Sequence, residues 1–285
     1  MVTPFAPGGA LDTDGLARLA THLVDALGHD GVLVNGTTGE APTTTDAEKD
    51  VVVRTVVEAV GDRAHVIAGV GTYDTAHSIH LARAAASAGA DALLVVTPYY
   101  NRPPQAGLVA HFTAVADSTD LPVITYDIPK RTGVAIEAET FARLAEHPRI
   151  VANKDAKGDL EAAQLVMART GLPWYSGDDA LNLPLLAVGA VGFISVVGHL
   201  VGDRIAAMAR AFEAGDIATA RRMNVELLPV YEGCFRTQGV IMTKAALADL
   251  GLPGGPVRPP LVDATSEQRA QLRADLARGG VAGFA

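Results

Sequence analysis

Cysteine is almost absent from this chain, in which Cys234 is the single example. One thiol cannot close an intramolecular disulfide or supply a multi-cysteine metal site, and such a composition is typical of a reducing compartment. The opening stretch "MVTPFAPGG" also lacks the basic residues of a secretory signal, because the first positive side chain is Arg18. We therefore expect a cytoplasmic protein.

Positive charge is scarce as well. Lysine and arginine together number 23 against 32 aspartates and glutamates, which gives the 285 residues a formal net charge of −9. Nucleic acids and anionic membranes are bound by basic surfaces. The charge balance therefore argues against both as partners.

Charged residues are missing altogether from residues 181–202, "LNLPLLAVGAVGFISVVGHLVG", a length that could span a bilayer. Pro184 and repeated glycines interrupt this stretch, and Asn182 and His199 add polar groups to it. We interpret it as a buried helix, a turn and a buried strand, and we predict no membrane span.

Short apolar runs rich in β-branched residues recur along the chain, each followed by an alanine-rich stretch of helical character. Seven are complete, and their starts lie 18 to 34 residues apart, which is the spacing of repeated βα units. Residues 2–5, "VTPF", resemble the tail of an eighth run, so we expect Met1 to be an internal or trimmed start. The complete runs cover residues 31–36, 65–71, 92–98, 122–129, 150–156, 174–179 and 192–197.

Two of the intervening helices have clear signatures. Residues 45–60 begin with Thr45 and Glu48 in the spacing of a capping box. Residues 13–28 place five apolar side chains on one helical face. These are Leu16, Leu19, Ala20, Leu23 and Leu27.

Buried strands that alternate with helices imply an α/β fold with a parallel sheet covered on both faces. Eight strands favour a closed (β/α)8 TIM barrel over an open doubly wound sheet, since no G-x-G-x-x-G follows the first strand. From about residue 215 the strand pattern stops and helical stretches follow. We therefore assign residues 1–214 to a barrel that holds the active site and residues 215–285 to a C-terminal helical appendage.

Reactive groups of such barrels lie where the strands end, and one strand end carries a lysine. Alternation along "RIVANKDAKGD" places Ile150, Ala152 and Lys154 on one face of the strand. Burial lowers the pKa of an amine from about 10.4, and an amine with a pKa of roughly 7–8 attacks carbonyls at neutral pH. Lys154 is thus a candidate nucleophile. The alternatives are a solvated lysine or one paired with Asp155.

Two neighbouring strand ends carry tyrosines. In "ITYDIPKRTG", Tyr126 has a phenol that could transfer protons, and Arg131 has a guanidinium that could bind a carboxylate. In "VVTPYYNRPP", Tyr99 and Tyr100 lie on a proline-rich loop. Aromatic packing or a subunit contact are alternative roles for these tyrosines.

The loop at residues 34–45, "VNGTTGEAPTTT", resembles an anion-binding turn. Successive backbone N–H groups in a glycine-rich turn form a concavity for anions, and the hydroxyls of Thr37 and Thr38 add donors. The loop lacks the lysine of a phosphate-binding loop, so a small carboxylate fits it better than a polyphosphate. The alternative is a plain glycine–threonine turn.

A metal site is not predicted. His77 and His80 lie three residues apart on a helix, but no third ligand lies at a matching spacing. We interpret both as surface histidines.

Six segments together resemble the dihydrodipicolinate synthases, a branch of the pyruvate-dependent Schiff-base aldolases that also include N-acetylneuraminate lyase. The resemblance extends over nearly the whole chain, in order, and it implies the same fold as the pattern of strands and helices. The segments are "GTTGE" (36–40), "TPYYNRP" (97–103), "YDIPKRTG" (126–133), "KDAKGD" (154–159), "SGDDALNLP" (176–184) and "GFISV" (192–196).

The resemblance implies a role for each residue of a pyruvate site. Lys154 would form an imine with pyruvate, and Tyr126 would transfer protons. Thr37 would link Tyr126 to Tyr100, which would reach in from a neighbouring subunit of a homotetramer, a dimer of dimers. Thr38 and the loop amides would hold the pyruvate carboxylate.

For the second substrate, the resemblance implies that Arg131 binds the carboxylate of L-aspartate 4-semialdehyde, while Gly177 and Ile194 line the pocket. The product would be 4-hydroxy-tetrahydrodipicolinate, on the route to diaminopimelate and lysine, with no cofactor or metal. One alternative is a related aldolase for a sugar acid or another aldehyde, which Arg131 argues against. Another is a silent keto-acid-binding barrel, which would need no amine nucleophile.

Some positions depart from the family pattern. Asp127 stands where asparagine is common, and Ala152-Asn153 replace a small and a branched residue; Asn153 is expected to face away from the barrel interior. The usual places for lysine-binding residues hold Asp46, Lys49, Tyr73 and His77. Feedback inhibition by lysine through that site is therefore not expected.

Overall fold

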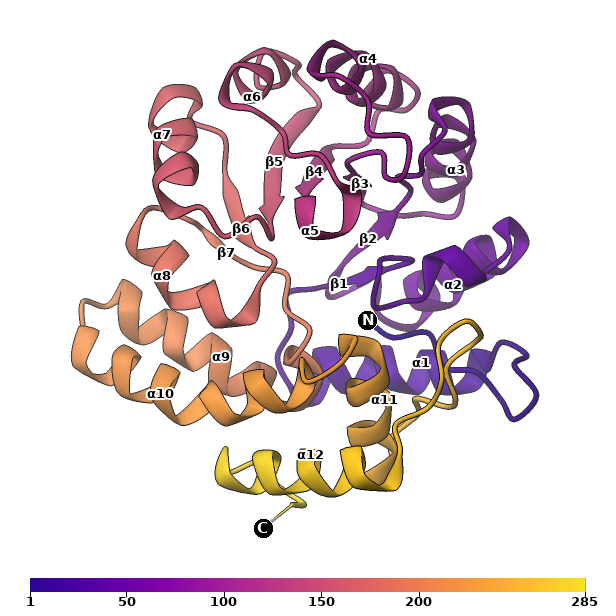
Figure 1. Cartoon of the computed structure of the whole chain (residues 1–285). Helices are drawn as coiled ribbons and strands as arrows, with labels where there is room; N and C mark the ends of the chain where they lie inside the picture. Colours follow the sequence, from indigo (N-terminus) through magenta and orange to yellow (C-terminus); the bar gives the residue numbers. More distant parts are fainter. Residues whose placement is uncertain (285) are drawn as a thin grey trace. The chain divides into compact units, whose positions relative to one another are not determined.

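The computed structural model describes residues 1–284, and its main feature is a parallel sheet of seven strands (Figure 1). Neighbouring strands follow one another in chain order. Each of the seven complete runs forms one strand, as predicted. The strands are β1 Gly31–Val34, β2 His65–Gly69, β3 Ala92–Val96, β4 Val123–Asp127, β5 Ile150–Asp155, β6 Trp174–Ser176 and β7 Gly192–Phe193.

Helices follow the strands along the chain, which confirms an α/β fold. They are α1 Thr13–Thr21, α2 Asp46–Val60, α3 Thr75–Ser87, α4 Gln105–Ala116, α5 Pro129–Thr132, α6 Ala138–Leu144, α7 Leu160–Thr170, α8 Asn182–Ala187 and α9 Gly198–Glu213. The predicted C-terminal helices are present as α10 Ile217–Cys234, α11 Gly239–Asp249 and α12 Ser266–Arg278. Three shorter helical segments are η1 His22–Ala26, η2 Ala41–Thr43 and η3 Asp179–Leu181.

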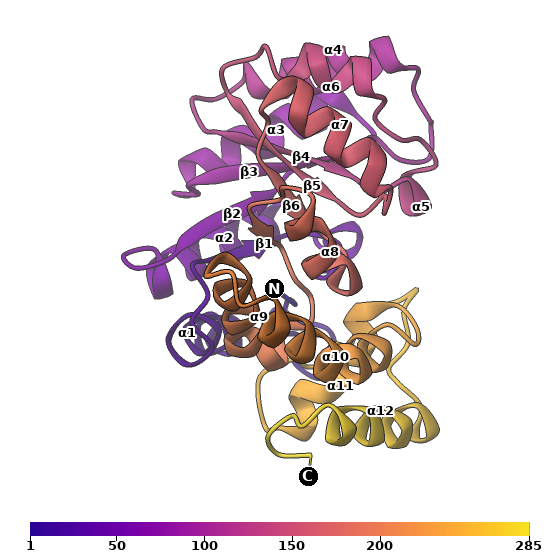
Figure 2. The same ribbon diagram turned by 90° about the vertical axis from the view of Figure 1, so that its left-hand side faces the viewer.

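The chain forms two compact units. One contains Met1–Val66 and the chain from Val196 onward, and the other is Ile67–Ser195. In the first unit, α10 contacts α9, α11 and α12, so the C-terminal helices form a layered group (Figure 2). The second unit begins within β2 and contains α3 and the strands β3 to β7 with the helices between them.

Local sequence signals explain where the first helices begin. Thr45 caps α2, and a full capping box with Glu48 is present. The predicted first helix is α1 followed by the π-helical turn η1. Its buried side chains include Leu16, Leu19 and Leu23, whereas Leu27 caps η1 and is half-buried.

Residues 2–5, the fragment of an eighth run, form no strand within the described chain. Phe5 makes an isolated antiparallel bridge with Leu11. The segment nevertheless lies beside β1 and the loop after it, because the Met1 amino group donates to Leu33 O (2.5 Å) and Thr3 Oγ1 donates to Gly39 O (2.7 Å).

The uncharged stretch at residues 181–202 contains α8, a turn and the short strand β7, and then enters α9. The predicted order of helix, turn and strand is confirmed. Across residues 1–284, no helix has both the length and the apolarity that a membrane span needs.

Candidate active site

Lys154 is the last residue but one of β5, and it lies in register with one residue on each of the two neighbouring strands. It is paired with Tyr126 of β4 on one side and with Tyr175 of β6 on the other. Its side chain is buried, with 7% of the residue exposed. Burial lowers the pKa of the amine to about 8, an effect that the charge of Asp179 opposes. About a tenth of the amine is therefore uncharged at pH 7, far more than for an amine with the ordinary pKa.

Tyr126 lies against this amine. The Lys154 Nζ is 4.4 Å from the centroid of the Tyr126 ring. Burial raises the pKa of the phenol to about 12, with Arg131 lowering it and Asp178 raising it. The hydroxyl is consequently protonated at neutral pH and is available as a proton donor.

Asp155 does not serve as the partner of Lys154, because other groups occupy its carboxylate. Its oxygens accept from Lys157 N (2.7 Å), Gly158 N (3.2 Å) and Trp174 Nε1 (2.9 Å). The carboxylate thereby fixes the turn that follows β5. The pairing of Lys154 with Asp155, considered from sequence, is not what the structure shows.

Asn153 has a structural role in the strand. Its Oδ1 accepts from Thr125 Oγ1 (2.8 Å), and the residue is fully buried. Asp127, on β4, is also buried and accepts from Ile136 N (3.2 Å). Burial raises the pKa of Asp127 to about 7, so near neutrality a large share of this carboxyl is uncharged. An uncharged aspartate resembles asparagine in shape and in charge, which bears on the departure from the family pattern expected at this position.

Gly177 closes one side of the lysine. A Cβ placed on Gly177 would lie 2.8 Å from Lys154 Cε and 3.0 Å from Asp155 O, closer than side-chain atoms normally approach. Ile194 lies beyond β7 and donates its N–H to Ser176 O (2.8 Å). Gly177 therefore touches the lysine side chain, and Ile194 belongs to the next strand end.

Arg131 and Tyr100 lie at the surface of the same unit. Arg131 is exposed on α5 and acts electrostatically on Tyr126. Tyr100 is 91% exposed and has a φ of 72°. Tyr99 packs edge-on against Tyr73, with ring centroids 5.5 Å apart, so Tyr99 has a packing role and Tyr100 does not share it.

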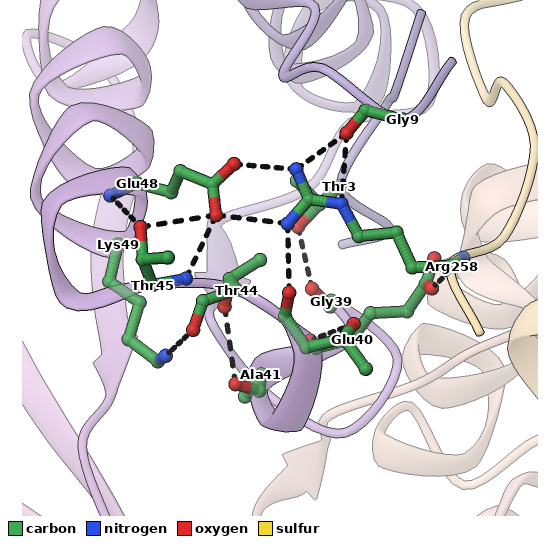
Figure 3. Close-up of polar contacts among 11 residues, drawn as sticks. Thr3, Gly9, Gly39, Glu40, Ala41, Thr44, Thr45, Glu48, Lys49 and Arg258 are labelled. Atoms are coloured by element: carbon green, nitrogen blue, oxygen red, sulfur yellow. Dashed lines mark hydrogen bonds and ion pairs between the residues drawn. The ribbon is translucent and has the colours of Figure 1, made fainter. Parts of the chain in front are cut away.

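Thr37 and Thr38 lie in the loop after β1, in the other unit. Both are half-buried, and they occupy a tight turn in which Gly39 N donates to Gly36 O (3.0 Å) and Glu40 N donates to Thr37 O (3.1 Å). Glu40 ends this turn with a left-handed φ of 56°. Figure 3 shows how Gly39 and Glu40 are held by residues outside the loop.

Some residues near the lysine escaped the sequence reasoning. Asp179 is buried, and its carboxylate accepts from Asn182 Nδ2 (3.2 Å) and from Ser195 Oγ. Asp179 belongs to the segment "SGDDALNLP", which carries part of the family resemblance. Nothing in the sequence indicated its hydrogen bonds to Asn182 and Ser195. Among residues 1–284, no group of three or more His, Cys, Asp and Glu side chains could hold a metal ion.

The rate of imine formation with a small keto acid is expected to depend on pH through Lys154. Only the uncharged amine attacks a carbonyl, and its fraction rises about tenfold per pH unit below the pKa of about 8. The rate should therefore rise from pH 6 to about 8 and then level off. Borohydride-quenched single-turnover measurements check this. A rate that continues to rise beyond pH 9.5 would indicate a solvated lysine instead.

Comparison with known proteins identifies the relatives of this chain. The model of the "Dihydrodipicolinate synthetase family" matches residues 1–278. The "4-hydroxy-tetrahydrodipicolinate synthase 2" of Streptomyces coelicolor is 66% identical over 281 residues, covering 99% of this chain and 94% of that protein. The corresponding synthase of Acidothermus cellulolyticus is 63% identical, covering 100% of this chain and 92% of that protein.

Solved structures agree with the sequence relatives. Dihydrodipicolinate synthase from Bacillus anthracis matches with a TM-score of 0.95 and 41% identity, over 97% of this chain and 95% of that one. The synthase from Cyanidioschyzon merolae, solved with lysine bound, matches with a TM-score of 0.96 and 41% identity, over 98% of this chain and 96% of that one. The chain belongs to the dihydrodipicolinate synthetase family.

Proposed function

We propose that this protein is a 4-hydroxy-tetrahydrodipicolinate synthase, a lyase that condenses pyruvate with L-aspartate 4-semialdehyde through a lysine Schiff base. The observation that carries the proposal is the buried amine of Lys154, 4.4 Å from the Tyr126 ring and with a pKa of about 8. Lys244, the other buried lysine over an aromatic ring, is paired with the Glu40 carboxylate (2.5 Å), whereas Lys154 lies at a strand end beside a phenol. The relatives are named for the product, 4-hydroxy-tetrahydrodipicolinate, and we assign pyruvate and L-aspartate 4-semialdehyde as the substrates, on the route to diaminopimelate and lysine.

The first half of the reaction uses the amine as nucleophile and electron sink. Lys154 attacks the keto carbon of pyruvate, and loss of water gives a protonated imine. Removal of a methyl proton moves the electron pair into the imine and gives an enamine. We assign the proton transfers to Tyr126, in a relay with Thr37 and Tyr100, and the binding of the pyruvate carboxylate to Thr38 and the loop amides.

In the second half, the enamine carbon attacks the aldehyde carbon of the semialdehyde, whose oxygen takes up a proton. The amino group of the second substrate then displaces Lys154 from the imine carbon, which closes the ring and releases the enzyme. Arg131 binds the carboxylate of the semialdehyde, and Gly177 and Ile194 line the pocket. The chemistry needs no cofactor or metal, because the imine itself stabilises the carbanion.

The proposal includes the assembly and the finer fold. We assign the protein to the cytoplasm and to a homotetramer in which Tyr100, 91% exposed in the single chain, enters the site of a neighbouring subunit. The proposed finer fold is a closed (β/α)8 barrel in which the segment at residues 2–5, which forms no strand, takes the place of an eighth strand beside β1. The barrel ends at residue 214, between α9 and α10, and the remainder is the helical appendage.

Arg131→Ala is expected to weaken use of the acidic aldehyde selectively. Loss of a charge-assisted carboxylate contact costs about 2–3 kcal/mol, so the KM for L-aspartate 4-semialdehyde should rise roughly 30- to 160-fold, whereas adduct formation with pyruvate should be unchanged. Coupled turnover assays measure both substrates.

Lys130→Ala is the matched control, because Lys130 is an exposed cation next to Arg131 on the same short helix. It should alter the KM by less than about twofold, as expected for an exposed charge. Turnover of an uncharged polyhydroxy aldehyde, with none of the acidic aldehyde, would favour the sugar-acid aldolase instead.

A further inference from the structure

The loop at residues 36–45 is held by an arginine from the far end of the chain (Figure 3). The Arg258 guanidinium donates to Thr43 O (2.8 Å), to Gly9 O (2.9 and 2.6 Å) and to both oxygens of Glu48 (2.9 and 2.5 Å). Its backbone N–H donates to Glu40 Oε2 (2.8 Å). One residue thus ties together the loop, the first turn of α2 and the N-terminal segment.

A buried ion pair reinforces this attachment. Lys244 Nζ of α11 lies 2.5 Å from Glu40 Oε1, and the two side chains are only 2% and 1% exposed. The same Nζ donates to Pro256 O (2.8 Å). Burial lowers the pKa of Lys244, and Glu40 opposes that effect. Two buried charges of opposite sign fix each other's position strongly, because either one left alone would be very unfavourable.

Phe5 fills the space between the two cations. Its ring centroid is 4.3 Å from Lys244 Nζ and 4.0 Å from Arg258 Cζ. The backbone of the C-terminal connector also approaches closely, since a Cβ on Gly255 would lie 1.9 Å from Phe5 O. Thr3 Oγ1 in turn donates to Gly39 O (2.7 Å). The turn that carries Thr37 and Thr38 is therefore attached at Gly39 and Glu40 to the two ends of the chain.

We propose that Glu40, Lys244 and Arg258 are positioning residues that set the affinity for pyruvate by holding the Thr37–Thr38 turn in place; we call them the loop clamp. This inference rests on the proposed function. Glu40 N donates to Thr37 O (3.1 Å), so a displacement of Glu40 displaces Thr37 directly. Through the loop clamp, the C-terminal part of the chain that carries Lys244 and Arg258 influences the pyruvate site. None of the three residues of the clamp is a catalytic residue.

A comparison with ion pairs that lie away from the loop separates positioning of the loop from stabilisation of the fold. Such ion pairs exist in the same unit. Asp249 of α11 pairs with Arg269 and Arg273 of α12, which join two C-terminal helices without touching the loop. Asp249→Asn therefore serves as the matched control for substitutions in the clamp.

The test compares wild type with Lys244→Met, Arg258→Lys and the double variant Glu40→Gln/Lys244→Met. The pyruvate concentration that gives half-maximal borohydride-trapped adduct on Lys154 is measured in each folded variant. We expect it to rise about tenfold or more in all three, with the KM for the aldehyde changed less than twofold. In the double variant the unfolding temperature should recover relative to Lys244→Met, while pyruvate binding stays weak.

Asp249→Asn should lower the unfolding temperature and leave the pyruvate dependence unchanged. Arg258→Lys is the mild variant, since it keeps the charge but cannot reach Gly9, Thr43 and Glu48 together. For this variant, amide hydrogen exchange at residues 36–40 should accelerate while exchange in α10 does not. These results would support the clamp as a positioning device.

Unchanged pyruvate dependence in folded clamp variants, or unchanged exchange at residues 36–40, would overturn the inference while leaving the proposed function standing. Failure of the wild-type protein to form an adduct on Lys154 would instead refute the proposed function and, with it, the inference.

Discussion

Lys154→Met is expected to abolish the borohydride-trapped pyruvate adduct and to reduce turnover by about 10⁴-fold or more, the scale on which removal of a nucleophile acts. Methionine has a similar length and no nucleophilic amine, so the imine cannot form. Intact-mass measurement and peptide mapping locate the adduct in wild type. An adduct on the neighbouring Lys157, with turnover preserved in the variant, would contradict this assignment.

The same variant should be more stable than wild type, which separates loss of chemistry from loss of folding. The pKa of Lys154 falls from 10.5 to about 8 in the folded state, and at 1.36 kcal/mol per pKa unit the buried ammonium costs about 3 kcal/mol near pH 7. The unfolded state binds more protons between pH 8 and 10.5, so wild type gains stability as the pH rises through this range. Urea unfolding should show the difference between the two proteins shrinking accordingly.

Tyr126→Phe is expected to lower kcat by about 10²- to 10³-fold, the typical contribution of a positioned proton donor. Phenylalanine keeps the ring against the amine and removes only the hydroxyl, whose pKa of about 12 keeps it protonated in wild type. The adduct should still form, but slowly. Rapid-quench kinetics of adduct formation and steady-state turnover measure the two effects.

Tyr175→Phe provides the control for this prediction. Tyr175 is the other neighbour of Lys154 in the sheet register, and it is half-buried. Loss of its hydroxyl should change kcat by less than about threefold, the range expected of a group outside the proton relay. Retention of more than half of wild-type turnover by Tyr126→Phe would remove Tyr126 from the mechanism.

Local patterns were sufficient to predict seven strands of the sheet and the buried lysine, whereas the eighth strand expected from residues 2–5 is not formed. The seven strands could be predicted because each run of β-branched residues is short, continuous and followed by a helical stretch. The capping box of Thr45 and Glu48 could be predicted because the two residues are only three positions apart. Lys154 could be predicted as a candidate nucleophile because a lysine is unusual in a strand whose other residues on the same face are apolar. Its contact with Tyr126 then follows from two adjacent strands ending at the same level.

Long-range contacts were beyond the reach of sequence patterns. Arg258 and Glu48 are separated by 210 positions, and nothing local in either segment indicates the partner. Lys244 did offer a signal, because it lies inside the apolar stretch "GVIMTKAALA", but that signal indicates burial and not the identity of the opposite charge. The role of Asp155 in fixing the following turn likewise depends on Trp174, which arrives from the next strand.

The closeness of Gly177 to Lys154 has a consequence for the evolution of substrate range in this protein. A Cβ at position 177 would lie 2.8 Å from Lys154 Cε and 3.0 Å from Asp155 O, so a side chain added at this position displaces the amine of Lys154. Variation that is compatible with catalysis must come from other strand ends, such as that of Ile194, or from the exposed Arg131. A library aimed at new aldehydes is therefore best built with residue 177 held constant.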